Sequence, residues 1–350
     1  MPNTKTFETL ESMQPELNNQ NATAQRIAKN KMLEGIFMPH TRQRRDNLYP
    51  PPGVAPARFV HYTSADAAIK IISQKQLWLR NASCMADYRE VQHGFDILRR
   101  FFINKDNEQS FVNAVNIFAP GVADEAIKLF NHWWSVGTIP HRTFIASVSE
   151  HDSSEDFHGR LSMWRAFGGS AARVGLVFNV PAQSAGAEAM RLIFSPVAYF
   201  KDEEADQLVP NVIKQLKSNV EFLKTIDSQE IQNWIFSMLL VNVTGVKHEG
   251  FREEKEWRIV HCPELYPTKL ITACTEIIGG VPQPVYKLPL DKAIDPVLED
   301  LDFAKTFDRL IIGPSPYPVA MADAFIEALS KIGVADAATR IFVSGIPIRS

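Results

Sequence analysis

Two clusters of polar side chains at the ends of predicted strands contain residue types that can bind ligands. His61-Tyr62-Thr63-Ser64 lies between the strand pattern RFVHY and an amphipathic helix pattern for which Thr63 is the expected N-cap. An imidazole can hydrogen-bond a hydroxyl group, and free N–H groups at a helix start suit an anion. A structural explanation competes, with a capping threonine, a core tyrosine and an internally satisfied histidine. The second cluster is Ser147-Val148-Ser149, where strand alternation directs both hydroxyl groups to one face.

A third cluster, running from Glu253 to Arg258, combines acidic and basic side chains at the start of the strand pattern EWRIV. If the strand begins near Glu254, then Glu254, Glu256 and Arg258 share one face. Two carboxylates on one strand face are unfavourable unless they are solvated, paired or used in chemistry. They could stabilise a cationic transition state and orient a nucleophile, or they could form an exposed charged strand edge.

Other chemical signals in the sequence are weaker. The segment from His151 to His158 contains ligand-type residues but no rigid spacing such as H-E-x-x-H, so we predict a solvated loop and no metal site. Motifs typical of dinucleotide-binding folds, P-loop proteins and α/β-hydrolases are absent from the sequence. Trp164 precedes a glycine pair in LSMWRAFGG and could line a pocket.

The elements that would position these residues alternate irregularly from Arg58 onward, which favours an α+β domain over a regular βαβ wind. Residues 1–57 are expected to form a partly disordered extension, and residues 58–350 a single domain with helical insertions over about 85–134 and 203–244. Within the extension, RIAKNKMLEGIFM predicts a docking helix and HTRQRRDNLYPPPGVAP an extended linker. Strands are expected at RFVHY, QLWLR, TFIASVS, RVGLVFNV, MRLIFSPVAYF, EWRIVHC, DRLIIGP and TRIFVSG.

Composition limits the classes of function that are open to the chain. Its 350 residues carry 37 basic and 40 acidic side chains, a net charge of −3, which disfavours a broad electrostatic nucleic-acid surface. Three cysteines (Cys84, Cys262 and Cys274) without metal-type spacing argue for a reducing compartment. The N-terminus has no apolar signal region and no apolar run reaches about 18 residues, so we expect a cytoplasmic protein without a membrane span.

Taken together, ordered blocks from about Arg58 to Arg349 resemble the bacterial domain of unknown function 2971 family. In that family an Asn-Asp pair often stands where this chain has Ala86-Asp87, and a tyrosine often stands at Phe167. Asp87 and Glu90 occupy a block where the family commonly carries acidic residues, and they are either functional or caps of the following helix. The blocks are HYTS, LWLRNASCMADYRE, FIASVSE, LSMWRAFGGSAARVGLVFN, FREEKEWRIV, DRLIIGP and FVSGIPIR.

The family in turn looks like a distant relative of the ADP-ribosyltransferase fold, which implies split mixed or antiparallel sheets with helical insertions. The resemblance implies that His61 holds the adenosine ribose of NAD, with Tyr62, Thr63 and Trp164 near the dinucleotide. It implies further that Ser147 and Ser149 support the nicotinamide side. Glu256 would bind the nicotinamide ribose and stabilise the oxocarbenium ion, and Glu254 would orient the acceptor nucleophile.

The implied activity is NAD-dependent ADP-ribosyl transfer to an unknown protein or nucleic-acid acceptor. The chain mixes two transferase classes, because one class carries arginine at position 61 and the other carries tyrosine where this chain has serines. An NAD glycohydrolase, which needs Glu256 but no Glu254, is one alternative. The other is a non-catalytic nucleic-acid- or protein-binding module in stress or phage defence. That module predicts salt bridges from Glu254 and Glu256 to residues such as Arg258 or Arg349.

Overall fold

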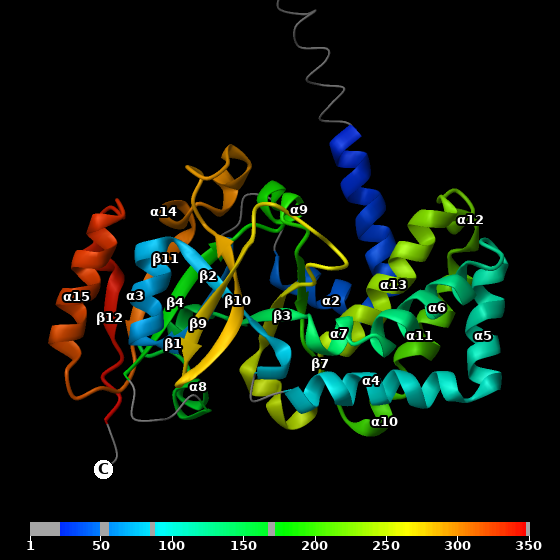
Figure 1. Ribbon diagram of the computed structural model, residues 1–350, viewed down its shortest axis with the longest axis horizontal. Helices are drawn as coiled ribbons and strands as arrows, with labels where there is room; N and C mark the ends of the chain where they lie inside the picture. The colour runs from blue at the N-terminus through cyan, green and yellow to red at the C-terminus, as the bar shows by residue number, and fades with distance from the viewer. Residues whose placement is uncertain (1–21, 50–55, 85–87, 167–171, 348–350) are drawn as a thin grey trace, which may run out of the picture.

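The computed structural model describes residues 22–49, 56–84, 88–166 and 172–347 of the chain. These residues form an α+β structure, as the sequence predicts, drawn out along one axis (Figure 1). The strands gather in one half of the molecule and most of the long helices in the other half (Figure 1). The residues of the predicted clusters are therefore described below by their position relative to the boundary between these two halves.

The strands of the first half form one large, mostly antiparallel sheet. Its main path runs β12-β11-β4-β1-β3-β2-β10-β9, and β8 joins the sheet at β3 and carries β5 on its other side. Only β11 and β12 pair in parallel within it. The strands are β1 (Ala57–Ser64), β2 (Gln76–Asn81), β3 (Phe144–Glu150), β4 (Arg173–Val180), β5 (Ile193–Pro196), β8 (Glu256–His261), β9 (Thr272–Ile278), β10 (Val281–Pro289), β11 (Phe307–Ile312) and β12 (Ile341–Val343). A separate parallel pair consists of β6 (Ala198–Phe200) and β7 (Val246–His248).

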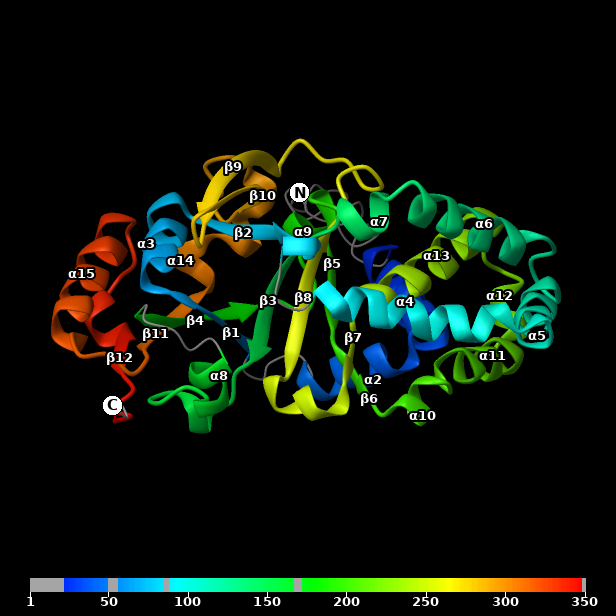
Figure 2. The same ribbon diagram turned by 60° about the horizontal axis from the view of Figure 1, so that its bottom comes forward.

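The sheet divides at β3. One edge of β3 pairs along its length with β8, from Phe144 to Ser149. The other edge is shared, because β1 pairs with β3 at Ser149 and Glu150 whereas β2 pairs with it at Phe144 and Ile145. Figure 2 shows β3 and β8 side by side at the centre, with β1 and β2 leaving β3 in different directions. Between these two pairings the backbone of β3 has no strand partner on this edge, so a side chain can hydrogen-bond to it.

The helical half is assembled from three segments that lie far apart in the sequence (Figure 1). Apolar side chains from all three, including Leu33, Phe111 and Leu239, share one buried core. The core reaches the sheet at Ile145 and Val260, so the helices cover one face of β3 and β8. The helices are residues 22–37, α2 (Pro39–Leu48), α4 (Tyr88–Ile103), α5 (Lys105–Asn116), α6 (Val122–Ser135), α7 (Thr138–His141), α10 (Asp202–Ala205), α11 (Leu208–Ser218), α12 (Val220–Leu223) and α13 (Ser228–Thr244).

A second core lies in the strand-rich half, where α3 (Ala65–Gln74) and α15 (Pro318–Lys331) cover the sheet. In α3 the buried residues Ala68, Ile71 and Ile72 follow helical spacing and form one apolar face. Its first turn is capped by Ser64, whose side chain accepts a hydrogen bond from the backbone of Ala67. The remaining short helices are η1 (Ala82–Cys84), η2 (Ser153–Glu155), α8 (Leu161–Ala166), α9 (Ala185–Ala189), η3 (Glu249–Glu254), η4 (Pro296–Leu301), α14 (Phe303–Thr306) and η5 (Ala337–Arg340).

Two sequence predictions need correction, and one element was missed. The N-cap of the first helix after β1 is Ser64 and not Thr63, because β1 continues to Ser64. The expected extended linker contains a helix instead, over Pro39–Leu48, stabilised by an ion pair between Arg42 and Asp46 one turn apart. The β9–β10 hairpin was not expected at all. No helix within the described residues combines the length and apolar character that a membrane crossing needs.

Candidate functional site

Three adjacent strands bring the predicted clusters together. His61 lies in β1, Ser147 and Ser149 lie in β3, and Glu256 begins β8, in the hydrogen-bonded order β1-β3-β8. Across β3 and β8, Ser147 stands opposite Arg258 and Ser149 stands opposite Glu256. All four side chains therefore lie on one face of these strands, the face that the helical half covers.

Glu256 is surrounded by hydrogen-bond donors. Its Oε1 accepts from Ser147 Oγ at 2.5 Å and from Arg258 Nε at 2.9 Å. Its Oε2 lies 2.9 Å from Lys247 Nζ and 3.3 Å from Arg258 Nη2. Since an ionised carboxylate offers about four lone-pair positions, these four contacts use its accepting capacity.

Lys247 connects the two glutamates of the third cluster. Its Nζ lies 2.8 Å from Glu254 Oε2 as well as 2.9 Å from Glu256 Oε2. The strand begins at Glu256, and Glu254 ends the preceding 3₁₀ helix η3, so the two glutamates do not alternate along one strand as predicted. They are nevertheless neighbours in space, because both bind the same ammonium group.

The carboxyl group of Glu256 is buried but held in its charged form. Glu256, Arg258 and Lys247 are 4%, 3% and 2% exposed. Burial alone would raise the pKa of Glu256, but the positive charges of Arg258 and Lys247 and the hydrogen bonds from Arg258 and Ser147 lower it to about 2. The carboxylate is therefore ionised throughout the neutral pH range.

Backbone groups complete the surroundings of this cluster. Arg258 Nη1 donates to the carbonyl of Thr244 at 2.6 Å, at the last residue of α13. Tyr199 Oη accepts a hydrogen bond from the backbone N–H of Glu256 at 2.8 Å. The C-terminal end of a helix carries partial negative charge, so it suits the guanidinium group. The structure thus fixes Arg258 and the first residue of β8 from two sides.

His61 occupies the division of the sheet. Its Nδ1 lies 2.9 Å from the backbone oxygen of Ser147, which is in the stretch of β3 between its pairings with β1 and β2. Burial lowers the pKa of His61 below its usual value, although the hydrogen bond to Ser147 opposes the shift. The imidazole also lines a cavity of about 1010 Å³ whose lining includes Val148 and does not include Ser147 or Glu256. His61 therefore touches the predicted site through the backbone of β3.

Tyr62, Thr63 and Trp164 are not brought to Glu256. The rings of Tyr62 and Trp164 pack edge to face at 4.8 Å in a small buried cluster. Tyr62 Oη accepts from the backbone N–H of Arg160, and Trp164 Nε1 donates to the carbonyl of His158. Thr63 is part of β1, paired with Val174 of β4. Their predicted contacts with a dinucleotide stay predictions, and their observed contacts are those of packing.

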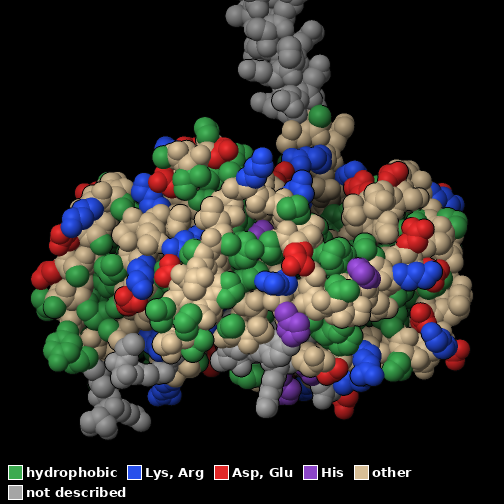
Figure 3. Space-filling model, in the orientation of Figure 1, with side chains coloured by type: hydrophobic (Ala, Val, Ile, Leu, Met, Phe, Trp, Pro, Cys, Tyr) green, Lys and Arg blue, Asp and Glu red, His purple; other side chains and the backbone are tan. Residues whose placement is uncertain are grey.

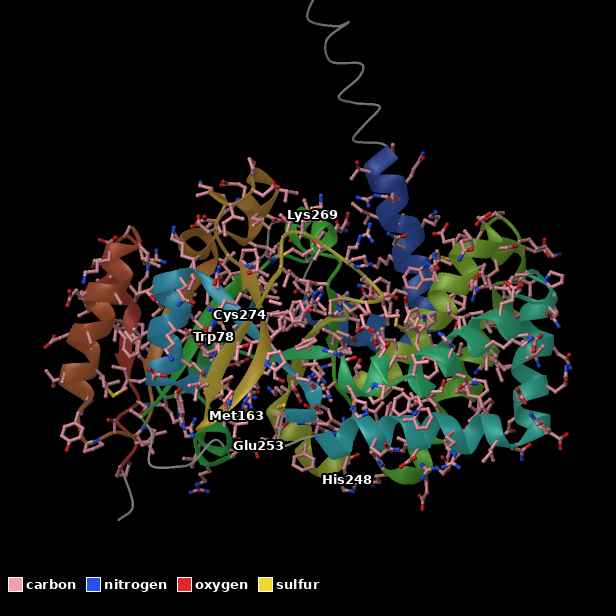
Figure 4. The ribbon with its side chains drawn as sticks, in the orientation of Figure 1. Trp78, Met163, His248, Glu253, Lys269 and Cys274 are labelled. Atoms are coloured by element: carbon pink, nitrogen blue, oxygen red, sulfur yellow. The ribbon has the colours of Figure 1, made fainter. Side chains whose placement is uncertain are left out.

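Arg160 was not singled out from the sequence, yet it holds the loops beside the site together. It pairs with Glu155 at 2.8 Å and donates to the carbonyls of Glu150, Glu253 and Glu254. Figure 4 labels Met163 in α8 and Glu253 in η3, two elements that contact each other near the lower edge of the view. Lys247 and Tyr199 were also missed, because a single lysine or tyrosine carries no spacing signal.

The segment around His151 forms ion pairs. His151 Nε2 lies 2.9 Å from Asp156 Oδ1, and Asp156 also binds Arg58 and Arg309 at 2.8 and 3.1 Å. Within the described residues, no group of three or more histidine, cysteine, aspartate or glutamate side chains is arranged to hold a metal ion. Asp87 and Arg349 lie outside the described residues, and the side chain of Glu90 is not described either.

Comparison with known proteins gives one result. Residues 163–259 match the model of a family described as a protein of unknown function, DUF2971. Over these residues the match confirms the family resemblance stated from the sequence, and the blocks before 163 and after 259 stay a prediction. The matched stretch contains Lys247, Glu254, Glu256 and Arg258 but not His61 or Ser147. No curated protein and no solved structure matches the chain.

Proposed function

We propose that the protein transfers ADP-ribose from NAD to an acceptor and that the reaction takes place at Glu256. The observation that carries this proposal is the contact path across three adjacent strands. It runs from His61 to the backbone of Ser147 at 2.9 Å, and from the hydroxyl of Ser147 to Glu256 at 2.5 Å. Clusters that are far apart in the sequence thus lie on adjacent strands, although the side chains of His61 and Glu256 are on opposite faces of the sheet.

The proposed chemistry uses the charge of Glu256. The bond between ribose C1′ and the nicotinamide nitrogen breaks, and its electron pair leaves with nicotinamide. The sugar is then an oxocarbenium ion, which an ionised, preorganised carboxylate stabilises. The acceptor forms a new bond to C1′ and releases its proton to solvent, while Glu254 orients the acceptor. A depressed pKa suits this role, because Glu256 must carry its charge at neutral pH.

The same geometry imposes a condition on the reaction. Four donor contacts already engage the carboxylate of Glu256, so a ribose hydroxyl can bind only if one of these donors moves aside. Lys247 also binds Glu254, so a small displacement of its side chain toward Glu254 would release Glu256 Oε2. The acceptor is proposed to be a protein or nucleic acid of unknown identity.

A second candidate is a binding module without catalysis, and one observation favours it. Both glutamates are salt-bridged, Glu254 to Lys247 and Glu256 to Lys247 and Arg258. Such pairing is what a purely structural cluster requires, because a buried charge is costly unless it is paired. On this reading Glu256 joins β3, β8 and β7, and the function lies on another surface.

Nicotinamide release separates these candidates. Purified protein is incubated with NAD while binding is followed by calorimetry, and Glu256→Gln and Glu254→Gln are measured in parallel. For transfer we expect Glu256→Gln to lower release at least about a hundredfold, which is typical for loss of one preorganised electrostatic contact. If the protein is a glycohydrolase, nicotinamide release should be lost in Glu256→Gln but not in Glu254→Gln. No NAD binding by the wild-type protein would refute both enzymatic readings and favour the binding module.

His61 provides an independent check. The resemblance implies a contact between His61 and the adenosine ribose, so His61→Ala should weaken NAD binding about fivefold to tenfold through one lost hydrogen bond. The dissociation constant from the same calorimetric titration measures this. An unchanged constant in a correctly folded variant removes His61 from the NAD site.

A further inference from the structure

The cavity lined by His61 is a separate feature from the Glu256 cluster. It has a volume of about 1010 Å³, at the upper end of the range for sites that hold drug-sized ligands. Its floor consists of strand side chains, among them Phe59 of β1, Val148 of β3 and Ile259 of β8. Each of these is a sequence neighbour of a residue on the opposite face, so the cavity lies across the sheet from Ser147, Glu256 and Arg258.

The roof of the cavity comes from the helix of residues 22–37 and from α2. Its charged groups bind one another: Arg42 and Arg45 both pair with Glu34, and Lys31 pairs with Asp46. Figure 3 shows basic side chains where the helix of residues 22–37 meets the body of the molecule. Because these charges nearly balance, the cavity suits a ligand that is uncharged or carries a single negative charge.

The hydrogen bond of His61 defines what the floor of the cavity offers to a ligand. The backbone oxygen of Ser147 can only accept, so the Nδ1 of His61 carries the hydrogen. In the neutral ring Nε2 is then an acceptor, and burial keeps the ring neutral by lowering its pKa. No hydrogen bond to Nε2 is found among the described residues. A ligand would therefore have to present an N–H or O–H group to His61.

The ring of Tyr49 also lines the cavity. The hydroxyl of Tyr49 is buried and has no hydrogen-bond partner in the part of the chain that the structure describes. Its ring packs against Phe59 and Trp257. The hydroxyl is closed off from solvent, so a ligand in the cavity meets the ring of Tyr49 rather than its hydroxyl, and the ring adds to the apolar lining.

We propose that this cavity binds a small molecule with an apolar body, one hydrogen-bond donor for His61 and at most one negative charge. The site lies across the sheet from Glu256, so its ligand does not reach that carboxylate, and His61 cannot bind this ligand and the adenosine ribose of NAD at the same time. His61 in its floor is linked to Glu256 through Ser147, whose backbone oxygen contacts His61 and whose hydroxyl donates to Glu256. The occupant is a small molecule because the cavity has the volume of a small-molecule site and is bordered by paired charges rather than by an exposed apolar surface.

The probe is the dye anilinonaphthalene sulfonate, which has an aromatic body, one N–H group and one negative charge. Its fluorescence is titrated on the full chain at low temperature. Two changes at one residue form a matched pair: Val148→Trp fills the cavity and Val148→Ala enlarges it. We expect saturable binding by the wild-type protein and by Val148→Ala, and at least tenfold weaker binding by Val148→Trp. His61→Phe keeps a ring but loses Nε2, and we expect binding about fivefold to tenfold weaker.

Equal dye affinity in the two Val148 variants would overturn the proposal, because it would show binding at the protein surface. The same holds if folded wild-type protein gives no saturable signal. Near-ultraviolet circular dichroism identifies a variant that fails to fold. If a Val148 variant does not fold, the dye affinity of His61→Phe is the test. Excess NAD is added last. Displacement of the dye would show that NAD occupies this cavity and overturn the proposal, whereas retained dye supports the proposal and shows that NAD does not contact His61.

Discussion

Replacing Glu256 by glutamine tests whether the buried charge cluster holds β8 in place. The substitution keeps the size of the side chain but removes the negative charge that lies between Lys247 and Arg258. It also turns an accepting oxygen into an N–H donor, which one of the two cations has to face. The free energy of unfolding should therefore fall, even though the shape of the core is preserved.

The magnitude follows from the pKa of Glu256. A shift from an ordinary value of 4.5 to about 2 means that the folded state favours the ionised form. At about 1.4 kcal/mol per unit, the charge contributes about 3 kcal/mol to folding. Removing one partner of a buried ion pair typically costs about 3–5 kcal/mol, in agreement with this figure.

The sign of the pH dependence is also determined. Because the folded-state pKa lies below the unfolded one, the contribution is complete above about pH 4.5 and disappears as the pH falls through about 2. We therefore expect wild-type and Glu256→Gln proteins to differ by about 3 kcal/mol at pH 7. The difference should shrink steadily below pH 4.5.

Thermal unfolding followed by circular dichroism at pH 7, 5 and 3 measures this difference. With about 2–4 °C per kcal/mol, the melting temperature of Glu256→Gln should be about 6–12 °C lower at pH 7. Glu254→Gln is the matched control, since Glu254 binds the same lysine but its side chain is 23% exposed. Lys247 keeps Glu256 as its partner in this variant, so Glu254→Gln should lose less stability than Glu256→Gln and melt at a higher temperature than that variant. Equal melting of the wild-type and Glu256→Gln proteins at pH 7 would refute the reasoning.

Two further predictions concern the packing beside the site. Tyr62→Phe removes the acceptor for the buried N–H of Arg160 and should lower the free energy of unfolding by about 1–3 kcal/mol, measured by urea titration. An unchanged midpoint would mean that water replaces the hydroxyl. Gly159→Ala should cost about 1–3 kcal/mol, because Gly159 has φ of +64° and an added Cβ would lie 2.6 Å from the ring of Trp164. A near-ultraviolet spectrum and melting temperature like those of the wild type would contradict this expectation.

Much of the fold was predictable because its patterns are local. The strand patterns RFVHY, TFIASVS and EWRIVHC correspond to β1, β3 and β8, and each carries an apolar face of period two. The β9–β10 hairpin escaped prediction although Gly279-Gly280 marks its turn, because prolines at 282 and 284 interrupt the strand pattern. The helix Pro39–Leu48 was missed because, beside the local pair of Arg42 and Asp46, its arginines contact distant residues such as Glu150, which a local pattern does not show.

The candidate site was predictable in its strands but not in its electrostatics. Alternation correctly placed Ser147 and Ser149 on one face. It could not show that Lys247, which follows α13, reaches both glutamates, since this contact depends on how the helix docks on the sheet. It also could not show that His61 and Glu256 lie on different faces, because β1 leaves β3 within one residue of His61. Divisions of a sheet depend on tertiary structure, and a single strand pattern does not reveal them.

The assembly of the helical half from distant segments has a consequence for synthesis on the ribosome. Lys29 and Glu230, which pair at 2.9 Å, are 201 residues apart, and Phe37 stacks on Trp234 in the same contact. At about 5–20 residues per second, the apolar face of the first helix waits roughly 10–40 s before its partner helix α13 is made. During that interval Leu33, Ile36 and Phe37 have no native partner in α13 to pack against. The nascent chain therefore exposes the apolar face of this helix for most of its elongation. The yield of folded protein in cells should depend on chaperones that bind such apolar segments.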